Sequence, residues 1–543
     1  MNSFRKIKNE DLRNILILAP IVIIGFFSNI WIRPAGLMEA RNFITAREMI
    51  ENDNFIIPTL NGSLRFEKPP FPTWVTAFVM KITGNSTDEY ILRIPSALTG
   101  ILFIVFLYYF VKFMTKDSRK SFITAFVGST TFMITKLACE NSWDIYVYVF
   151  AFGTILFTIK GFQNKKIKEF IIGGIFLGIS ILSKGPIGIY GLIFPFFTAY
   201  TVVYGFSDIK QNIKNIFIMF ITALVCLSVW VIPVYSCHPD IFLGVMKKEQ
   251  GTWSHSHTES FIYYIDYFIY MGIWILFSIL TLVKKWSKKR SDDKNFSKFI
   301  FIWNILVIIL LSFIKMKKKR YGLPIYFTSI MGVGIICTYY WNRTWEEIKK
   351  SDKLLIVCQG MFIIIISFTI PIIVFFKGYI SGTVQWQYMI ILLLIFFPLG
   401  YFIYISLFFS RKNEKVLKRI ILGSGFLMFM INLTVNSYFD RNFIRDVKTI
   451  ENYPKIKMFQ KNPCLLEIYS DNYEIEDVWR VGKKIINYEK EIKLPEKFIF
   501  FGEIPEELLE EYKIFKREIY LKEDGTTTEI NYLKKLITEE EKL

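Results

Sequence analysis

The stretch KNIFIMFITALVCLSVWVIPVYS, residues 214–236, decides the class of fold. Its only charged residue is the lysine at its first position, and nearly all the others are apolar. A run of roughly 18 or more apolar residues predicts a helix that crosses a membrane. Similar runs recur along the chain, separated by short charged loops. The sequence therefore predicts an all-α polytopic membrane protein.

The composition favours the same class. Of the 543 residues, 52% are hydrophobic and 21% are charged, and the mean hydropathy is +0.36. A soluble globular protein is less apolar and more charged, and a disordered chain lacks the 17% of aromatic residues found here. The net charge of +19 fits basic cytoplasmic loops, so we expect membrane lipids and no nucleic acid as partners. The six cysteines are scattered, which argues against a zinc ribbon or a disulfide framework.

We expect about thirteen transmembrane helices. The apolar runs lie at residues 14–32, 92–114, 120–137, 143–160, 168–183, 185–204, 214–236, 261–283, 299–314, 322–340, 353–376, 386–409 and 418–436. The basic N-terminal residues MNSFRKIKNEDLR precede the first run without a clear cleavage site, which predicts an uncleaved signal anchor. With the N-terminus in the cytoplasm, the basic loops 116–120, 164–168, 284–298 and 410–419 are all cytoplasmic, as the positive-inside rule requires.

This orientation places two large regions outside. The first outer loop, residues 33–90, contains two amphipathic stretches, 39–50 and 72–83, joined by a polar turn at Asn61-Gly62-Ser63. We expect outer amphipathic helices there, of the kind that lie along a membrane surface. Residues 437–543 are far more polar and predict a small α/β extracytoplasmic domain, separate from a transmembrane domain of residues 1–436.

Several residues with chemical potential fall on this outer side. The loop 237–260 contains all three histidines, which are either metal ligands or ordinary loop residues. The basic stretch KMKKKR, residues 315–320, breaks the positive-inside rule, so its cations predict an anion at the membrane surface. Glu67 and Lys68 lie in the proline-rich turn RFEKPPFPTW, where a carboxylate suits a metal and an ammonium suits a phosphate. They are otherwise a solvated charge pair.

Asp144, Lys184, Glu39 and Arg41 are further candidates with simple structural alternatives. Asp144 begins an apolar run and is also a plausible N-cap, whereas Lys184 lies between two runs and is also a plausible snorkelling lysine. Glu39 and Arg41 open the first amphipathic stretch, where a solvated helix face explains them equally well. Together these residues predict an outer pocket that suits a lipid-linked phosphate.

Residues 37–84, LMEARNFITAREMIENDNFIIPTLNGSLRFEKPPFPTWVTAFVMKITG, resemble the first outer loop of bacterial membrane glycosyltransferases of the GT-C fold. The group is the protein mannosyltransferase-like family that includes the enzyme adding 4-amino-4-deoxy-L-arabinose to lipid A. RIPSAL (93–98), SWDIY, LSKGP, HTES-x-x-YY and KKKRYGLP also follow the order of that family. The resemblance covers roughly residues 10–330.

The resemblance implies a role for each candidate. Glu67 and His257 resemble the metal-binding pair of the family, which implies a divalent metal cofactor. Asp144 resembles a family acid. The cations that correspond to phosphate-binding positions or lie beside them are Lys68, Arg41, Lys184, Lys319 and Arg320. Two positions depart from the family pattern. Met38 replaces the usual aspartate, which leaves Glu39 or Asp144 as the base. Arg65 replaces a common aromatic and adds a phosphate-binding cation.

The function implied is transfer of a sugar from a polyprenyl-phosphate carrier to a lipid A-like glycolipid, an envelope glycan or a protein outside the inner membrane. Direct attack by the acceptor would invert the anomeric centre. The alternative is a flippase or transporter for the polyprenyl-linked sugar. It is less favoured because a transporter binds its substrate near the midplane of the bilayer, whereas these residues gather at the outer surface.

Overall fold

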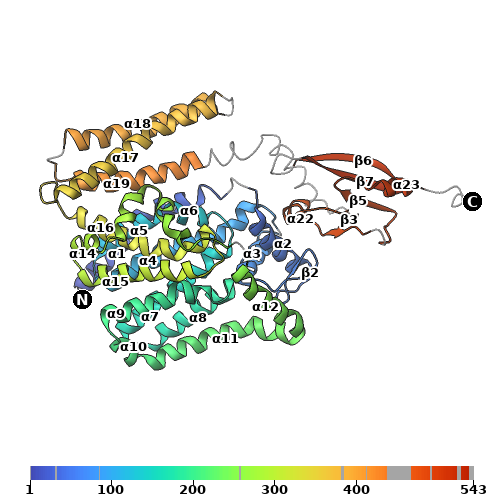
Figure 1. Ribbon diagram of the computed structural model, residues 1–543, viewed down its shortest axis with the longest axis horizontal. Helices are drawn as coiled ribbons and strands as arrows, with labels where there is room; N and C mark the ends of the chain where they lie inside the picture. The colour runs from blue at the N-terminus through green and yellow to red at the C-terminus, as the bar shows by residue number, and fades with distance from the viewer. Residues whose placement is uncertain are drawn as a thin grey trace, which may run out of the picture. The chain divides into compact units, whose positions relative to one another are not determined.

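The computed structural model describes residues 2–30, 34–84, 86–255, 258–380, 384–410, 413–436, 466–489, 492–521 and 527–536 (Figure 1). The chain separates into two compact units. The helical unit comprises Met1–Trp31, Phe66–Pro72 and Arg93–Ser437. The sheet unit comprises Ile32–Arg65, Thr73–Leu92 and Tyr438–Leu543. Each unit is described by itself below.

The helical unit is built almost entirely from helices. Those that it contains wholly or in large part are α1 (Asn2–Phe27), α4 (Glu89–Thr115), α5 (Ser118–Ser129), α6 (Phe132–Ala138), α7 (Trp143–Asn164), α8 (Ile167–Lys184), η1 (Ile189–Ile193), α9 (Phe194–Tyr204), α10 (Ser207–Gln211), α11 (Ile213–Cys237), α12 (Pro239–His255), η2 (Phe261–Trp274), α13 (Ile275–Thr281), α14 (Lys284–Lys289), α15 (Lys294–Phe313), η3 (Lys319–Gly322), α16 (Leu323–Trp341), α17 (Lys350–Val374), η4 (Phe375–Tyr379), α18 (Trp386–Phe408), α19 (Val416–Met430) and η5 (Ile431–Asn436).

Every apolar run predicted to cross the membrane falls on one of these helices. Among the described residues, nine helices are long and apolar enough to cross, and a tenth counts if α5 and α6, bent by 65° from each other, form one span. Residues such as Phe217, Leu224 and Ile232 of α11 are exposed, as side chains that face lipid would be. The chain is therefore a multi-pass membrane protein with fewer clear spans than the thirteen expected.

Close packing of α8 fixes one wall of the helical unit. Figure 1 shows α7, α8 and α11 running alongside one another, and α8 packs on both of the others. A Cβ added at Gly174 would lie 2.5 Å from the Met219 carbonyl oxygen of α11, and one at Gly178 would lie 2.5 Å from the Cβ of Cys226. Small residues four apart let helix backbones approach closely in membranes. This contact holds the end of α8, where Lys184 is found.

The sheet unit combines the first outer loop with the C-terminal residues. From the loop come α2 (Leu37–Glu51), the hairpin β1 (Thr59–Leu60) and β2 (Ser63–Leu64), and α3 (Phe71–Ile82) from Thr73 onward. The predicted polar turn forms this hairpin, with Asn61 and Gly62 both at positive φ, 52° and 79°. Such a pair of residues is the usual sequence of a tight hairpin turn.

The C-terminal residues form a mixed five-stranded sheet. Its elements are β3 (Ile468–Ser470), α22 (Ile475–Val481), β4 (Ile485–Asn487), β5 (Lys497–Phe501), α23 (Glu506–Glu511), β6 (Tyr512–Leu521) and β7 (Thr527–Lys535). The strand order is β4-β3-β5-β7-β6, with β3 parallel to both neighbours and β7 antiparallel to both of its own. A β sheet therefore forms where the α/β domain is expected.

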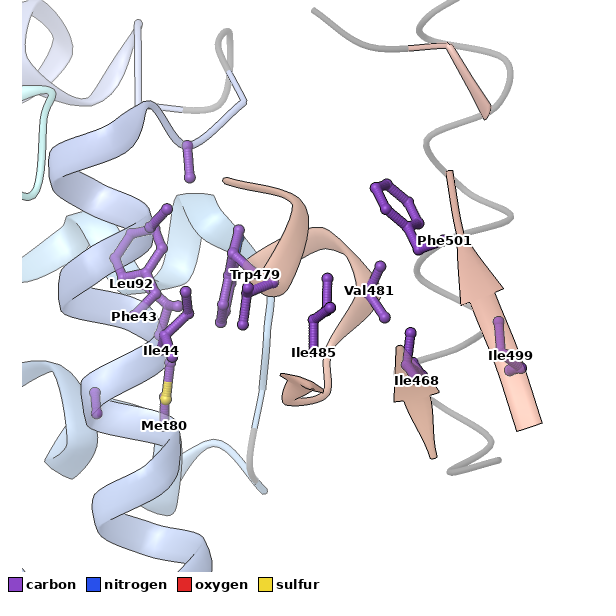
Figure 2. Close-up of a cluster of buried hydrophobic side chains, with 14 of the residues drawn as sticks. Phe43, Ile44, Met80, Leu92, Ile468, Trp479, Val481, Ile485, Ile499 and Phe501 are labelled. Carbon is purple, nitrogen blue, oxygen red and sulfur yellow. The ribbon is translucent and has the colours of Figure 1, made fainter. Parts of the chain in front are cut away.

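A shared core joins the loop to this sheet. Figure 2 shows Trp479 of α22 between Phe43 and Ile44 of α2 and the side chain of Ile485. The rings of Phe43 and Trp479 are 5.0 Å apart, and the indole N–H of Trp479 donates to Glu89 Oε1 at 3.0 Å. The apolar face of α2 is thus covered by protein, where the sequence suggested a membrane surface. The periodicity that marks an interfacial helix cannot distinguish these two partners.

Hydrogen bonds also connect the first outer loop to the C-terminal sheet. The side-chain amide of Asn61 donates to the Ile485 carbonyl at 2.8 Å, and its oxygen accepts from the Ile485 N–H at 3.0 Å. The asparagine thereby pairs with the backbone of β4 as a neighbouring strand would. The other face of the sheet has a separate apolar core that includes Tyr469, Phe498 and Leu533. Alternate residues of β3 and β5 face the two cores, as the period of a strand requires.

Candidate active site

Asp144 and Lys184 form a buried ion pair at the ends of two helices. Asp144 lies in the first turn of α7, where a carboxylate is stabilised by the helix dipole, and it has no exposed surface. Lys184 is the last residue of α8, before Gly185 at φ 73° ends the helix. The Nζ atom of Lys184 lies 2.5 Å from Asp144 Oδ1 and 4.1 Å from the centre of the Tyr321 ring.

Arg320 approaches the same carboxylate from a third element. It lies in η3, and its Nε atom is 3.7 Å from Asp144 Oδ2, which accepts no hydrogen bond from the described part of the chain. The carboxylate therefore orients two cations at once. One of its oxygens keeps a lone pair for a proton or a further donor.

The proline-rich turn contributes a second pair of charges. Lys68 precedes Pro69 and Pro70, whose fixed φ angles stiffen the turn. Its Nζ atom lies 2.8 Å from Glu249 Oε2 of α12, and both side chains are about a quarter exposed, at 23% and 27%. Next to it, Glu67 Oε2 is buried and accepts no hydrogen bond from any residue that the structure describes.

These groups meet at a cavity of about 270 Å³. Its charged lining residues are Glu67, Lys68, Lys184 and Glu249. The apolar lining is contributed mainly by α8, α11 and α12 and includes Ile181, Leu227, Trp230, Val231, Phe242 and Met246. The cavity thus combines charged groups that suit a phosphate with apolar walls that suit a hydrocarbon chain. Pockets with few polar groups in apolar walls are typical ligand sites.

Lys319 does not point toward this cavity. Its Nζ atom lies 2.8 Å from both carboxylate oxygens of Asp266 and 3.0 Å from the Tyr263 carbonyl oxygen, and it is stacked 3.7 Å above the Tyr263 ring. Lys319 and Arg320 are adjacent in sequence but have different partners. Of the two, Arg320 approaches Asp144.

Glu39, Arg41 and Arg65 belong to the sheet unit. Glu39 lies in the first turn of α2 and is buried. The guanidinium of Arg65 donates to the Arg41 carbonyl at 2.8 Å and to the Thr45 hydroxyl at 2.9 Å. Arg65 therefore attaches the first turns of α2 to the loop. Its proposed contact with phosphate would be additional to these bonds.

Comparison with known proteins identifies the class of enzyme. Residues 67–233 match the family model described as dolichyl-phosphate-mannose-protein mannosyltransferase. The undecaprenyl phosphate-alpha-4-amino-4-deoxy-L-arabinose arabinosyl transferase of Photorhabdus laumondii is 21% identical over 429 residues, covering 75% of this chain and 74% of its own. The crystal structure of ArnT from Cupriavidus metallidurans bound to undecaprenyl phosphate superposes with a TM-score of 0.71 at 14% identity, covering 95% of this chain and 97% of its own.

The chain is a membrane glycosyltransferase of the GT-C fold. The resemblance seen in the sequence is confirmed. An uncharacterized protein of Aquifex aeolicus is a further relative, 22% identical over 377 residues, which cover 67% of this chain and 70% of its own.

Of the two metal ligands expected from the family resemblance, only Glu67 lies within the described residues. His257 lies outside the described residues. Within the part that the structure describes, no three histidine, cysteine, aspartate or glutamate side chains form a group that could hold a metal ion. The buried, unpartnered Glu67 Oε2 is nevertheless the kind of atom that a cation would satisfy. The ring of His238 packs 6.0 Å from the ring of Phe66 instead.

Sequence reasoning missed Glu249, which is the only charged residue of α12 among those lining the cavity. The segment 237–260, expected to be an outer loop, contains the helix α12. Phe242, Met246 and Glu249 line the cavity at the spacing i, i+4, i+7, so they share one face of that helix. This spacing is the feature of the sequence that could have indicated a helix face containing Glu249.

Proposed function

We propose that this glycosyltransferase moves a sugar from a polyprenyl-phosphate carrier to an acceptor on the extracytoplasmic face of the inner membrane, with inversion at the anomeric carbon. The acceptor is a lipid A-like glycolipid, an envelope glycan or a protein. The cavity carries this proposal, because its lysines suit a phosphate and its walls suit a prenyl chain. The Photorhabdus relative is named for an undecaprenyl phosphate-linked sugar, and the Cupriavidus structure has undecaprenyl phosphate bound.

In the proposed reaction, an acceptor hydroxyl oxygen forms a bond to the anomeric carbon as the bond from that carbon to the phosphate oxygen breaks. The electron pair of the broken bond stays on the phosphate, and polyprenyl phosphate leaves as a dianion. Lys68 and Lys184 stabilise the developing charge, with Arg320 beside them. Loss of one such preorganised donor typically lowers the rate by about 10²–10³.

A carboxylate accepts the proton of the acceptor hydroxyl. Asp144 offers an oxygen without a hydrogen bond, but it also orients Lys184 and Arg320. Glu39 is the second candidate because it is the acid that remains of the family's acidic pair, whose first position is Met38 in this chain. The pH–rate profile separates them, since replacing the true base removes the acidic limb of the profile.

A divalent metal is part of the proposal as an accessory. Glu67 would supply one ligand, and His257 the second. Bound there, the metal would help to neutralise phosphate charge. We likewise propose from the family resemblance that Arg41 and Lys319 act in phosphate binding, and that Arg65, a departure from the family pattern, adds a further cation.

We also propose thirteen transmembrane spans. Beyond the nine clear ones, these are α5 with α6, α1, α8 and the helix over residues 189–204. This count places the N-terminus in the cytoplasm and residues 437–543 outside, on the same side as the first outer loop, with which their described part shares a core. The basic cytoplasmic loops support the orientation.

Sugar transfer in reconstituted membranes tests the proposal. Purified protein in liposomes receives a panel of undecaprenyl-phosphate sugars with envelope acceptors, and labelled product is measured. We expect product from the wild type, a large loss in Lys68→Ala, and no loss in Lys247→Ala, an exposed lysine of the same helix as Glu249. If the carrier lipid crosses the bilayer with its sugar still attached for the whole panel, the transporter alternative replaces the transferase.

A further inference from the structure

Glu249 is a negative charge in a cavity proposed to bind an anion. Its Oε2 atom lies 2.8 Å from Lys68 Nζ, and it shares the α12 face of Phe242 and Met246. The charged lining residues are two lysines and two glutamates, so their formal charges cancel. A carboxylate beside the phosphate site weakens the binding of any anion by Coulomb repulsion. Glu249 has no role in the reaction proposed above.

Turnover changes the charge of the lipid phosphate. The donor is a phosphodiester, which carries one negative charge. The product is a phosphomonoester, whose second ionisation has a pKa of about 6, so near neutral pH it approaches two negative charges. Cations that stabilise the leaving phosphate also hold the product, and tight product binding limits turnover. A fixed negative charge beside the site counteracts this, because it repels the product about twice as strongly as the donor.

We propose that Glu249 promotes product release by disfavouring dianionic polyprenyl phosphate relative to the monoanionic donor. In the absence of phosphate its carboxylate is paired with Lys68. Phosphate binding breaks that pair, and departure of the product restores it. This inference rests on the proposed function, since it requires that the lipid phosphate binds beside Lys68.

Binding measurements with two ligands of different charge test the inference. The probes are undecaprenyl phosphate and its methyl diester, titrated at pH 8 into the full-length protein in detergent. In Glu249→Gln we expect the Kd of the monoester to fall about ten-fold and that of the diester about three-fold, the ratio expected when each ligand charge contributes equally. Glu249→Ala should give the same preference and guards against a local effect of glutamine.

Two variants serve as controls. Glu249→Asp keeps the charge and should keep the wild-type ratio of the two dissociation constants. Asp240→Asn removes a carboxylate from the exposed first turn of the same helix, away from the cavity lining, and should change neither constant. In the transfer assay, Glu249→Gln should be inhibited more strongly by added undecaprenyl phosphate.

The outcomes distinguish failure of this inference from failure of the proposed function. If both neutral variants change the affinity for monoester and diester by the same factor, Glu249 only competes for Lys68, and the inference is overturned. If the wild-type protein binds neither lipid, the proposed function itself fails.

Discussion

The candidate phosphate-binding cations have different partners in the two units. In the helical unit, Lys68, Lys184 and Arg320 have carboxylates as partners, and the two lysines line the cavity. In the sheet unit, Arg65 donates to a backbone carbonyl and a hydroxyl within α2. A phosphate can replace a carboxylate as the partner of a lysine. It cannot replace the Arg41 carbonyl without detaching the turn of α2 that Arg65 holds.

Lys68 and Lys184 therefore have partners that a ligand phosphate can replace, whereas the hydrogen bonds of Arg65 maintain the fold. Lys319 is paired with Asp266 and does not line the cavity. Sequence alone assigned all of these cations to phosphate. The comparison predicts that changes in the helical unit act mainly on activity, whereas changes in the sheet unit act mainly on stability. Four substitutions test this division.

Trp479→Ala should have the largest effect, on the stability of the sheet unit. Trp479 is 2% exposed and packs on Phe43, so its removal leaves a cavity between α2 and α22. Large-to-small core changes of this kind cost about 3–5 kcal/mol. Hydrogen exchange of the β3 and β5 amides in the full-length protein measures the loss. Phe515→Ala, at a side chain that is 56% exposed, is the control and should change exchange little. Equal exchange in both variants would contradict a shared core.

Lys184→Met should act on activity. The change keeps the length of the side chain but removes the charge beside the cavity, so we expect transfer to fall about 10²–10³-fold. Single-turnover transfer measures it. Lys210→Met, at an exposed lysine of α10, is the matched control. A loss of less than about three-fold would remove Lys184 from the phosphate site and break the comparison.

Arg65 distinguishes a structural cation from a phosphate ligand. In Arg65→Met the partly buried Arg41 carbonyl and the buried Thr45 hydroxyl each lose one hydrogen bond, which costs about 1–3 kcal/mol. We expect faster hydrogen exchange in the first turns of α2 and a partial return in Arg65→Lys. Unchanged exchange with a large rise in the donor KM would instead support a phosphate contact.

Lys319→Ala should have the smallest effect. The ion pair with Asp266 is partly exposed, at 27% and 37%, and such pairs contribute about 0–1 kcal/mol. We expect transfer within about three-fold of wild type, and a larger loss in Arg320→Ala. If Lys319→Ala lost the more activity of the two, the assignment by partner would be wrong at this position.

Local sequence patterns were sufficient to predict the helices but not all the contacts that the helices make. Each apolar run became a helix, because a helix satisfies its own backbone groups and needs no distant partner. The pairing of Asp144 with Lys184 could be expected, since both were placed on the outer side by the same alternation of spans. Glu249 was not predicted, because residues 237–260 are expected to be a loop, although the spacing of Phe242, Met246 and Glu249 is that of one helix face.

The sequence did not predict the contacts between the first outer loop and the C-terminal residues. The apolar residues of α2 indicated a buried face but not that Trp479 would cover it. Likewise, Arg65 replaces a common aromatic of the family and was expected to add a phosphate-binding cation, while its actual partners depend on how the loop folds back on α2. The resemblance left the partners of these residues open.

The shared core of the sheet unit has a consequence for biogenesis. Phe43 and Met80 are synthesised long before Ile468 and Trp479, which complete their surroundings. At about 5–20 residues per second, the delay is roughly 20–80 seconds. During that time the ribosome is still producing most of the helical unit, and the apolar side of α2 is without its cover. A chaperone or the bilayer surface must shield the nascent loop until the last strands are made.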